Sequence, residues 1–148
     1  MKISSAIAGG LAGTCTVALL HESLKKVTQA SPRMELLDME ALSKILKSIK
    51  VKIPEYDQLL KWTLAGEIIT HTLYYSVTGI GKKGIWLKGI LLGVAAGITA
   101  VVLPKPLGLN RAPSNRSPQT EAMTIAMYLA GGLAASAVSK LVIDKGNP

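Results

Sequence analysis

The sequence predicts an all-α protein that crosses a membrane as a four-helix bundle, and three observations support this. Of the 148 residues, 49% are hydrophobic and only 18% are charged, whereas roughly 25% is usual for soluble domains. Phe is absent while glycines number 14, so the helices are expected to pack through small residues rather than large aromatic ones. Four stretches are apolar and long enough to approach the ~20 residues that a bilayer core requires.

The four predicted spans are residues 3–20, 59–80, 84–103 and 123–143. The first is uncharged, and its length and the lack of an A-x-A cleavage site favour a retained membrane helix over a signal peptide. Lys61, Lys88 and Lys140 lie near the ends of the other three spans, where a long side chain reaches the headgroups. Trp62 and Trp86 also lie near span ends, as interfacial aromatic residues do.

Small residues recur at helical spacing within these spans. Gly9 and Gly13 in the first span, and Gly93 and Gly97 in the third, give GxxxG spacing, and Gly131 begins a similar pattern in the fourth. This spacing is typical of membrane helices whose backbones approach closely. The first and third spans also resemble each other, which predicts two tandem helix–loop–helix units of the same orientation within a single membrane domain, residues 1–148.

The loop after the first span contains a predicted amphipathic helix, about residues 34–53. Its apolar residues repeat at helical spacing and its other face is basic, which suits a helix lying on an anionic leaflet. A short helix packed over the mouth of the bundle is the alternative. The candidate lipid-headgroup contacts are Lys44, Lys47, Lys50 and Lys52.

The net charge of +8 comes from 17 Lys and Arg against 9 Asp and Glu. No helix-turn-helix, RRM or basic–aromatic pattern accompanies it, so we expect no nucleic-acid partner. Anionic lipids explain the charge more simply. The first and third loops carry more Lys and Arg than the opposite side, so the positive-inside rule places them in the cytoplasm. The predicted location is a bacterial inner membrane, with several crossings.

Four ionisable residues are the candidate functional site, because charge is costly inside a bilayer. Glu67 and His71 stand one helical turn apart in the second span, and His21 and Glu22 end the first. Three interpretations stay open: a proton or ion relay, a metal site built from the same four residues, or an interhelical hydrogen-bonded pair that only specifies packing. The HExxH pattern of zinc enzymes is absent.

No nucleophile triad or phosphate-binding loop occurs in the sequence. We therefore expect a non-enzymatic protein without a cofactor. It would be a structural or accessory subunit, as a homo-oligomer or within a larger membrane complex, or a proton- or ion-linked transport element. The alternative is a membrane metal-binding protein or an enzyme that uses the His and Glu residues of the bundle.

Short motifs occur in a fixed order over most of the chain. They are Glu22, Pro32-Arg33, Thr70-His71, Lys88-Gly89 with Gly93, the Pro106–Leu109 stretch and Glu121. In this order the chain resembles the YagU-like family of small bacterial inner-membrane proteins. The resemblance implies a role in acid tolerance. The fourth helix departs from the family pattern, since apolar residues around Met127 stand where a His is expected after the Glu.

Overall fold

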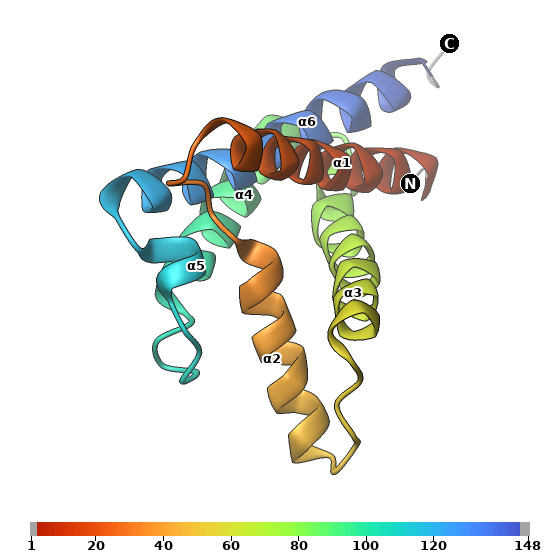
Figure 1. The fold of residues 1–148 in the computed structure, drawn as a ribbon. Coiled ribbons are helices and arrows are strands. Elements are labelled where there is room, and N and C mark those ends of the chain that lie inside the picture. Colours follow the sequence, from red (N-terminus) through yellow and green to blue (C-terminus); the bar gives the residue numbers. More distant parts are fainter. Residues whose placement is uncertain (1–2, 146–148) are drawn as a thin grey trace.

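A computed structural model describes residues 3–145, and throughout that range the regular structure is helical. Figure 1 shows two groups of helices, with α2 and α3 extending away from α1, α4 and α6. The elements are α1 (Ile3–Val27), α2 (Met34–Ser48), α3 (Tyr56–Ser76), the 3-10 turn η1 (Val77–Gly79), α4 (Ile85–Val102), α5 (Ala112–Asn115) and α6 (Pro118–Lys145).

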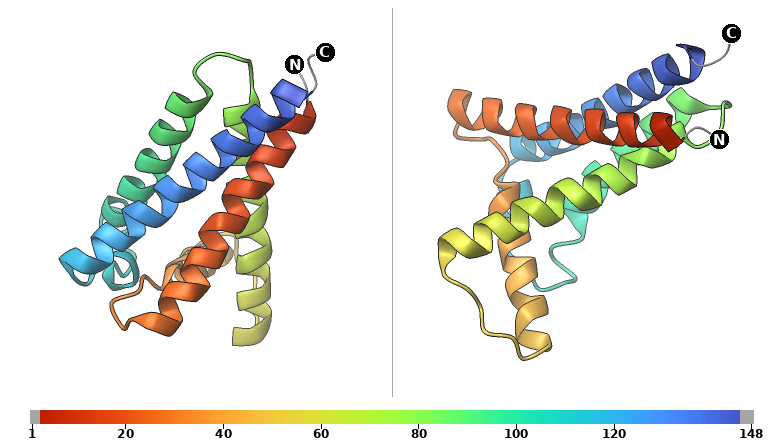
Figure 2. Two further views of the ribbon diagram at one scale, coloured as in Figure 1. Left: turned by 90° about the horizontal axis from the view of Figure 1, so that it is seen from above. Right: turned by 90° about the vertical axis from the view of Figure 1, so that its right-hand side faces the viewer.

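Helix α6 lies between α1 and α4 and runs antiparallel to both (Figure 2). The direction follows from the contacts. Gly9 of α1 lies against Ser139 of α6, whereas Gly13, further along α1, lies against Gly131. On the other side of α6, Gly89 faces Gly132. Helices α1 and α4 therefore point the same way.

These contacts are close enough to require glycine. A Cβ atom on Gly132 would lie 2.1 Å from the carbonyl oxygen of Gly89, and one on Gly89 would lie 2.0 Å from Ser136 Oγ. Ser136 Oγ donates a hydrogen bond across the contact to the carbonyl of Ile85 (2.8 Å). The small-residue positions of the sequence thus lie where helix backbones touch, as membrane helices require for packing.

Helix α3 joins this group only at its C-terminal end (Figure 2). Thr14 of α1 and Thr72 of α3 share a hydrogen bond of 3.1 Å, and the hydroxyl of Tyr75 donates to the carbonyl of Tyr128 in α6 (2.8 Å). The fully buried Tyr75 belongs to a core that also contains Val17 and Met127. Toward Tyr56 the helix moves away from α1, and α2 packs beside it there.

Three helices are long and apolar enough to cross a membrane: α1, α4 and α6. They correspond to the first, third and fourth predicted spans. The second predicted span, residues 59–80, is helical as α3 and η1, but it carries Lys61 and Glu67 and is not among these three. The membrane character of the fold is therefore supported for three helices, whereas the four-helix bundle and the tandem repeat stay predictions.

Several boundaries differ from the sequence-based expectation. Helix α1 continues to Val27, beyond the predicted end at residue 20. The amphipathic helix ends at Ser48, not near 53, because Lys50 adopts a positive φ of 58° and the amide of Val51 turns back to the carbonyl of Leu46. The last helix begins at Pro118, before the expected 123. Proline suits a first helical position, and Ser117 Oγ accepts a hydrogen bond from the amide of Thr120 (3.1 Å).

Large apolar side chains stay exposed along the outer faces of α1, α3 and α4, although the backbone contacts are tight. Isolated exposed apolar residues are normal, but long rows of them along helices are typical of surfaces covered by lipid. The exposed residues include Ile3, Ile7, Leu11, Leu19, Ile68, Ile69, Leu73, Leu87, Ile90, Leu91 and Ile98.

Replacing Gly132 by Ala is expected to destabilise the protein by about 1–3 kcal/mol, because the new methyl group meets backbone rather than a flexible side chain. The measurement is the melting temperature of the purified protein in detergent. Gly66→Ala is the matched control, since a Cβ there meets nothing within 4 Å and Ala favours a helix. Equal melting temperatures for Gly132→Ala and the wild type would show that the α4–α6 contact is looser than described.

Candidate functional site

Three adjoining cavities separate α3 from its neighbours, and we call them together the polar groove. One lies between α1 and α3 (about 300 Å³), one between α2 and α3 (about 280 Å³), and one is bounded by α2, α3, α4 and α6 (about 340 Å³). His71 lines all three. Asp38 and Glu67 each line two.

The four site residues predicted from the sequence line one cavity, the one between α1 and α3. Glu67 and His71 point into it rather than toward the outer surface, with side chains 17% and 19% exposed. Their closest atoms, Glu67 Oε1 and His71 Nδ1, are 3.9 Å apart. That distance is within ion-pair range but too long for a direct hydrogen bond.

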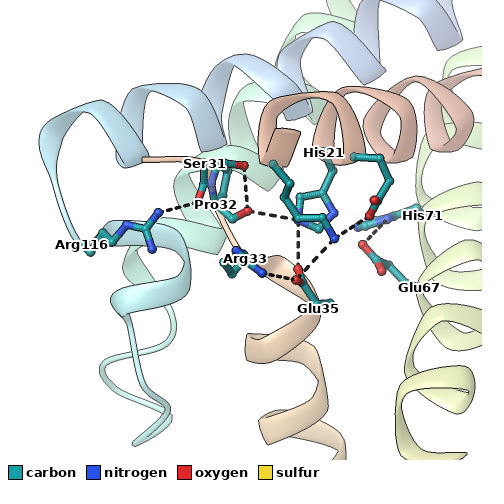
Figure 3. Close-up of polar contacts among 10 residues, drawn as sticks. His21, Ser31, Pro32, Arg33, Glu35, Glu67, His71 and Arg116 are labelled. Carbon is teal, nitrogen blue, oxygen red and sulfur yellow. Dashed lines mark hydrogen bonds and ion pairs between the residues drawn. The ribbon is translucent and has the colours of Figure 1, made fainter. Parts of the chain in front are cut away.

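His21 and Glu22 line the same cavity but have partners elsewhere, and Figure 3 labels those of His21. Glu22 Oε1 lies 2.6 Å from Lys25 Nζ, and its side chain is mostly exposed. His21 Nε2 lies 3.1 Å from the carbonyl oxygen of Pro32 and 3.1 Å from Oε2 of Glu35. His21 therefore anchors the turn after α1, and it does not form a direct pair with Glu67 in this structure.

Glu35 is a site residue that the sequence reasoning missed. It lies buried at the start of α2, with Oε1 3.5 Å from Lys25 Nζ and 3.6 Å from Arg33 Nη1. Burial alone would raise the pKa of this carboxyl, but the hydrogen bond and charge of His21, a backbone hydrogen bond and Lys25 lower the pKa to about 2. Glu35 is thus a fixed negative charge next to the groove.

Asp38 is the second missed residue, and it lies inside the groove. Burial raises its pKa to about 7, the charges of Glu67 and Glu35 act in the same direction, and His21 acts against them. The sequence did hold a signal: Asp38 is one turn before Leu42 and so falls on the apolar face of the amphipathic helix. A carboxyl group on such a face is expected to be buried rather than solvated.

Aromatic side chains close the groove on the side of α6. The ring of His71 packs edge-on against Tyr128, with centroids 5.5 Å apart, and more loosely against Tyr75. The hydroxyl of Tyr75 donates to the carbonyl of Tyr128, and that of Tyr74 donates to the carbonyl of Leu92, both at 2.8 Å. Both hydroxyls are therefore engaged with backbone carbonyls, and the acidic and basic side chains that line the groove are those of Asp38, Glu67, His71, His21 and Glu22.

The predicted headgroup lysines divide into two kinds. Lys44 turns toward the chain, where its ammonium group donates to the carbonyls of Leu107 and Gly108 and lies 3.8 Å from Glu40. The other three, Lys47, Lys50 and Lys52, are exposed. The α2 helix itself packs against α3 through Met39, Leu46 and Leu59, while Ile45 and Ile49 stay exposed.

Among residues 3–145, no three His, Cys, Asp or Glu side chains gather closely enough to hold a metal ion. Comparison with protein-family models, with curated proteins and with solved structures finds no match to this chain. The described chain is an all-helical protein with three helices apolar enough to cross a membrane and a polar groove beside them.

Replacing Asp38 by Asn is expected to stabilise the protein above neutral pH. In the folded protein the pKa of Asp38 is about 7, above its ordinary value of 3.8. The folded chain therefore holds a proton that the unfolded chain has released, and the stability of the wild type falls as pH rises from about 4 to 7. Asn carries no charge, so Asp38→Asn should melt a few degrees higher than wild type at pH 8 and equally at pH 4.

The measurement is thermal unfolding in detergent at both pH values. Asp57→Asn, an exposed position in the first turn of α3, serves as the control and should not show this pH-dependent gain. A variant at Asp38 that is less stable than wild type at pH 8 would mean that the ionised carboxylate is stabilised by its surroundings.

Proposed function

We propose that this chain is a multi-pass protein of a bacterial inner membrane that binds and passes protons through the polar groove, as a proton-linked transport element. The observation that carries the proposal is the meeting of Asp38, Glu67 and His71 in adjoining cavities beside three membrane-length helices. Ionisable groups held at such a place are costly, and in membrane proteins they mark proton and ion paths.

The direction of the helices supports a membrane crossing by α3. Helices α1 and α4 both run antiparallel to α6, so the chain leaves α1 at one end of the molecule and begins α4 at the other. Helix α3 makes the return and runs antiparallel to α1. Thr72 near the end of α3 contacts Thr14, and Gly79 in the following turn η1 accepts a hydrogen bond from Ser5, nearer the start of α1. If α1 and α4 cross a bilayer, α3 crosses it too and carries Glu67 and His71 with it.

The chemistry of the groove suits proton transfer. Imidazole accepts a proton on one ring nitrogen and donates from the other, which suits a proton relay. Nδ1 of His71 faces Glu67 across 3.9 Å, a gap that a small side-chain rotation closes to hydrogen-bond length. Asp38 lines two of the cavities with His71, and its pKa of about 7 makes it a group that gains and loses a proton near physiological pH.

Fixed charges keep the groove polar at the end where α1 meets α2. Glu35 with Lys25, Arg33 and His21 forms a compact ion network there (Figure 3). The excess of Lys and Arg in the first and third loops favours a cytoplasmic position for this end. A role in acid tolerance, which the resemblance to the YagU-like family implies, would draw on the same proton-binding groups.

Proton flux into liposomes tests the proposal. The purified chain is reconstituted with an internal pH dye, and a potassium gradient with valinomycin drives proton entry. We expect flux above that of empty liposomes and at least a tenfold loss in Glu67→Gln and in His71→Ala, because each removes a proton-binding group from the groove. Asp57→Asn, an exposed carboxyl on the same helix, should keep wild-type flux.

Two results would overturn the proposal. Wild-type flux equal to that of empty liposomes would exclude proton conduction under a driving force. Wild-type flux that persists in Glu67→Gln and His71→Ala, together with a lower melting temperature, would assign the pair to helix packing.

A further inference from the structure

Another cavity, of about 710 Å³, lies away from the polar groove, where α1 ends and α6 begins. We call it the basic pocket. Its lining contains no carboxyl group and has four cationic side chains together with the hydroxyls of Thr28 and Ser117. The cations are Lys25, Lys26, Arg33 and Arg116.

Nearby carboxylates neutralise only part of the positive charge of the basic pocket. Lys25 pairs with Glu22 and Glu35, and Arg33 lies 3.6 Å from Glu35. Within residues 3–145, neither Lys26 nor Arg116 takes part in an ion pair. Four cations against two carboxylates leave an excess positive charge on the pocket wall.

Helix ends add to this arrangement. The N-terminus of α6, a helix of 28 residues, begins beside the pocket, and the positive end of its dipole attracts anions. Ser117 Oγ already accepts from the amide of Thr120, and Glu121 stands in the same turn, so the cationic side chains dominate the charge of the pocket. The C-terminal carbonyls of α1 carry the opposite charge, but Lys25 and Lys26 stand in the last turn of that helix and offset it.

The pocket wall is held in place by hydrogen bonds between segments far apart in the sequence. Arg116 Nη2 donates to the carbonyl of Ser31 (2.9 Å), as Figure 3 shows, and Thr120 Oγ1 donates to the carbonyl of Ala30 (2.9 Å). The amide of Arg33 donates to the carbonyl of Pro113 (2.8 Å). These hydrogen bonds hold the backbone segments that carry Arg33 and Arg116 in place.

We propose that the basic pocket binds a phosphate group, either that of an anionic phospholipid or free inorganic phosphate. One N–H group of the Arg116 guanidinium donates to the carbonyl of Ser31. The other N–H groups of this planar cation suit hydrogen bonds to phosphate oxygens. The pocket lies at the ends of two helices that are long and apolar enough to cross a membrane. That is the level at which phospholipid headgroups lie. This inference does not depend on proton transport.

Calorimetry tests the inference by measuring how tightly short-chain lipids bind to the full chain in a neutral detergent. The ligands are dioctanoyl phosphatidylglycerol, dioctanoyl phosphatidylcholine and inorganic phosphate. We expect phosphatidylglycerol to bind at least tenfold more tightly than phosphatidylcholine. Competition by inorganic phosphate at comparable concentration would identify free phosphate as the ligand, and its failure to compete would identify the lipid.

Variants connect the binding to the pocket. Lys26→Gln and Arg116→Gln should each weaken phosphatidylglycerol binding about tenfold, whereas Lys47→Gln, an exposed lysine of α2, should not. Because Arg116 also holds Ser31, the Lys26 variant is decisive if Arg116→Gln folds poorly. Wild-type binding in Lys26→Gln, or equal binding of the two lipids by wild type, would overturn the inference.

Discussion

The backbone of α6 touches the backbones of α1 and α4, and the rest of the fold depends on these two contacts. Gly131 faces Gly13 of α1, whereas Gly132 faces Gly89 of α4. Successive residues of a helix point about 100° apart, so one glycine pair sets the angle at which both neighbours approach. Because α6 runs antiparallel to each of them, α1 and α4 must be parallel, and the chain between them has to return along the molecule.

That return is made by α3, and it explains where the polar groove lies. The helix is held close to α1 and α6 only at its end, around Thr72 and Tyr75, and it has no glycine contact with them further back. The space that opens toward its start is closed by α2, which brings Asp38 to Glu67 and His71. Tight packing of three helices and loose packing of a fourth thus produce a cavity that accommodates charge.

The sequence predicted helical structure and three of the membrane-length helices, because apolar runs and GxxxG spacing are local signals. It also selected His21, Glu22, Glu67 and His71 as candidate site residues, and in the structure all four line the cavity between α1 and α3. It did not predict Glu35 and Asp38. The burial of Glu35 depends on the approach of α2 to the end of α1, and that of Asp38 on the docking of α2 against α3; local spacing encodes neither contact. The position of Asp38 on an otherwise apolar helix face indicated that it is buried. The interpretation of this helix relied instead on its basic face, and Asp38 was not selected.

The membrane crossing of α3 is the central claim, since it decides whether Glu67 and His71 lie within a bilayer. The most direct test labels single cysteines at Gln58 and Lys83, in a Cys15→Ser chain, with a membrane-impermeant maleimide on sealed vesicles of known orientation. Gln58 lies in the first turn of α3, and Lys83 follows η1. We predict that they are labelled from opposite sides. Labelling of both from the same side would contradict the account, because α3 would then lie along the membrane surface.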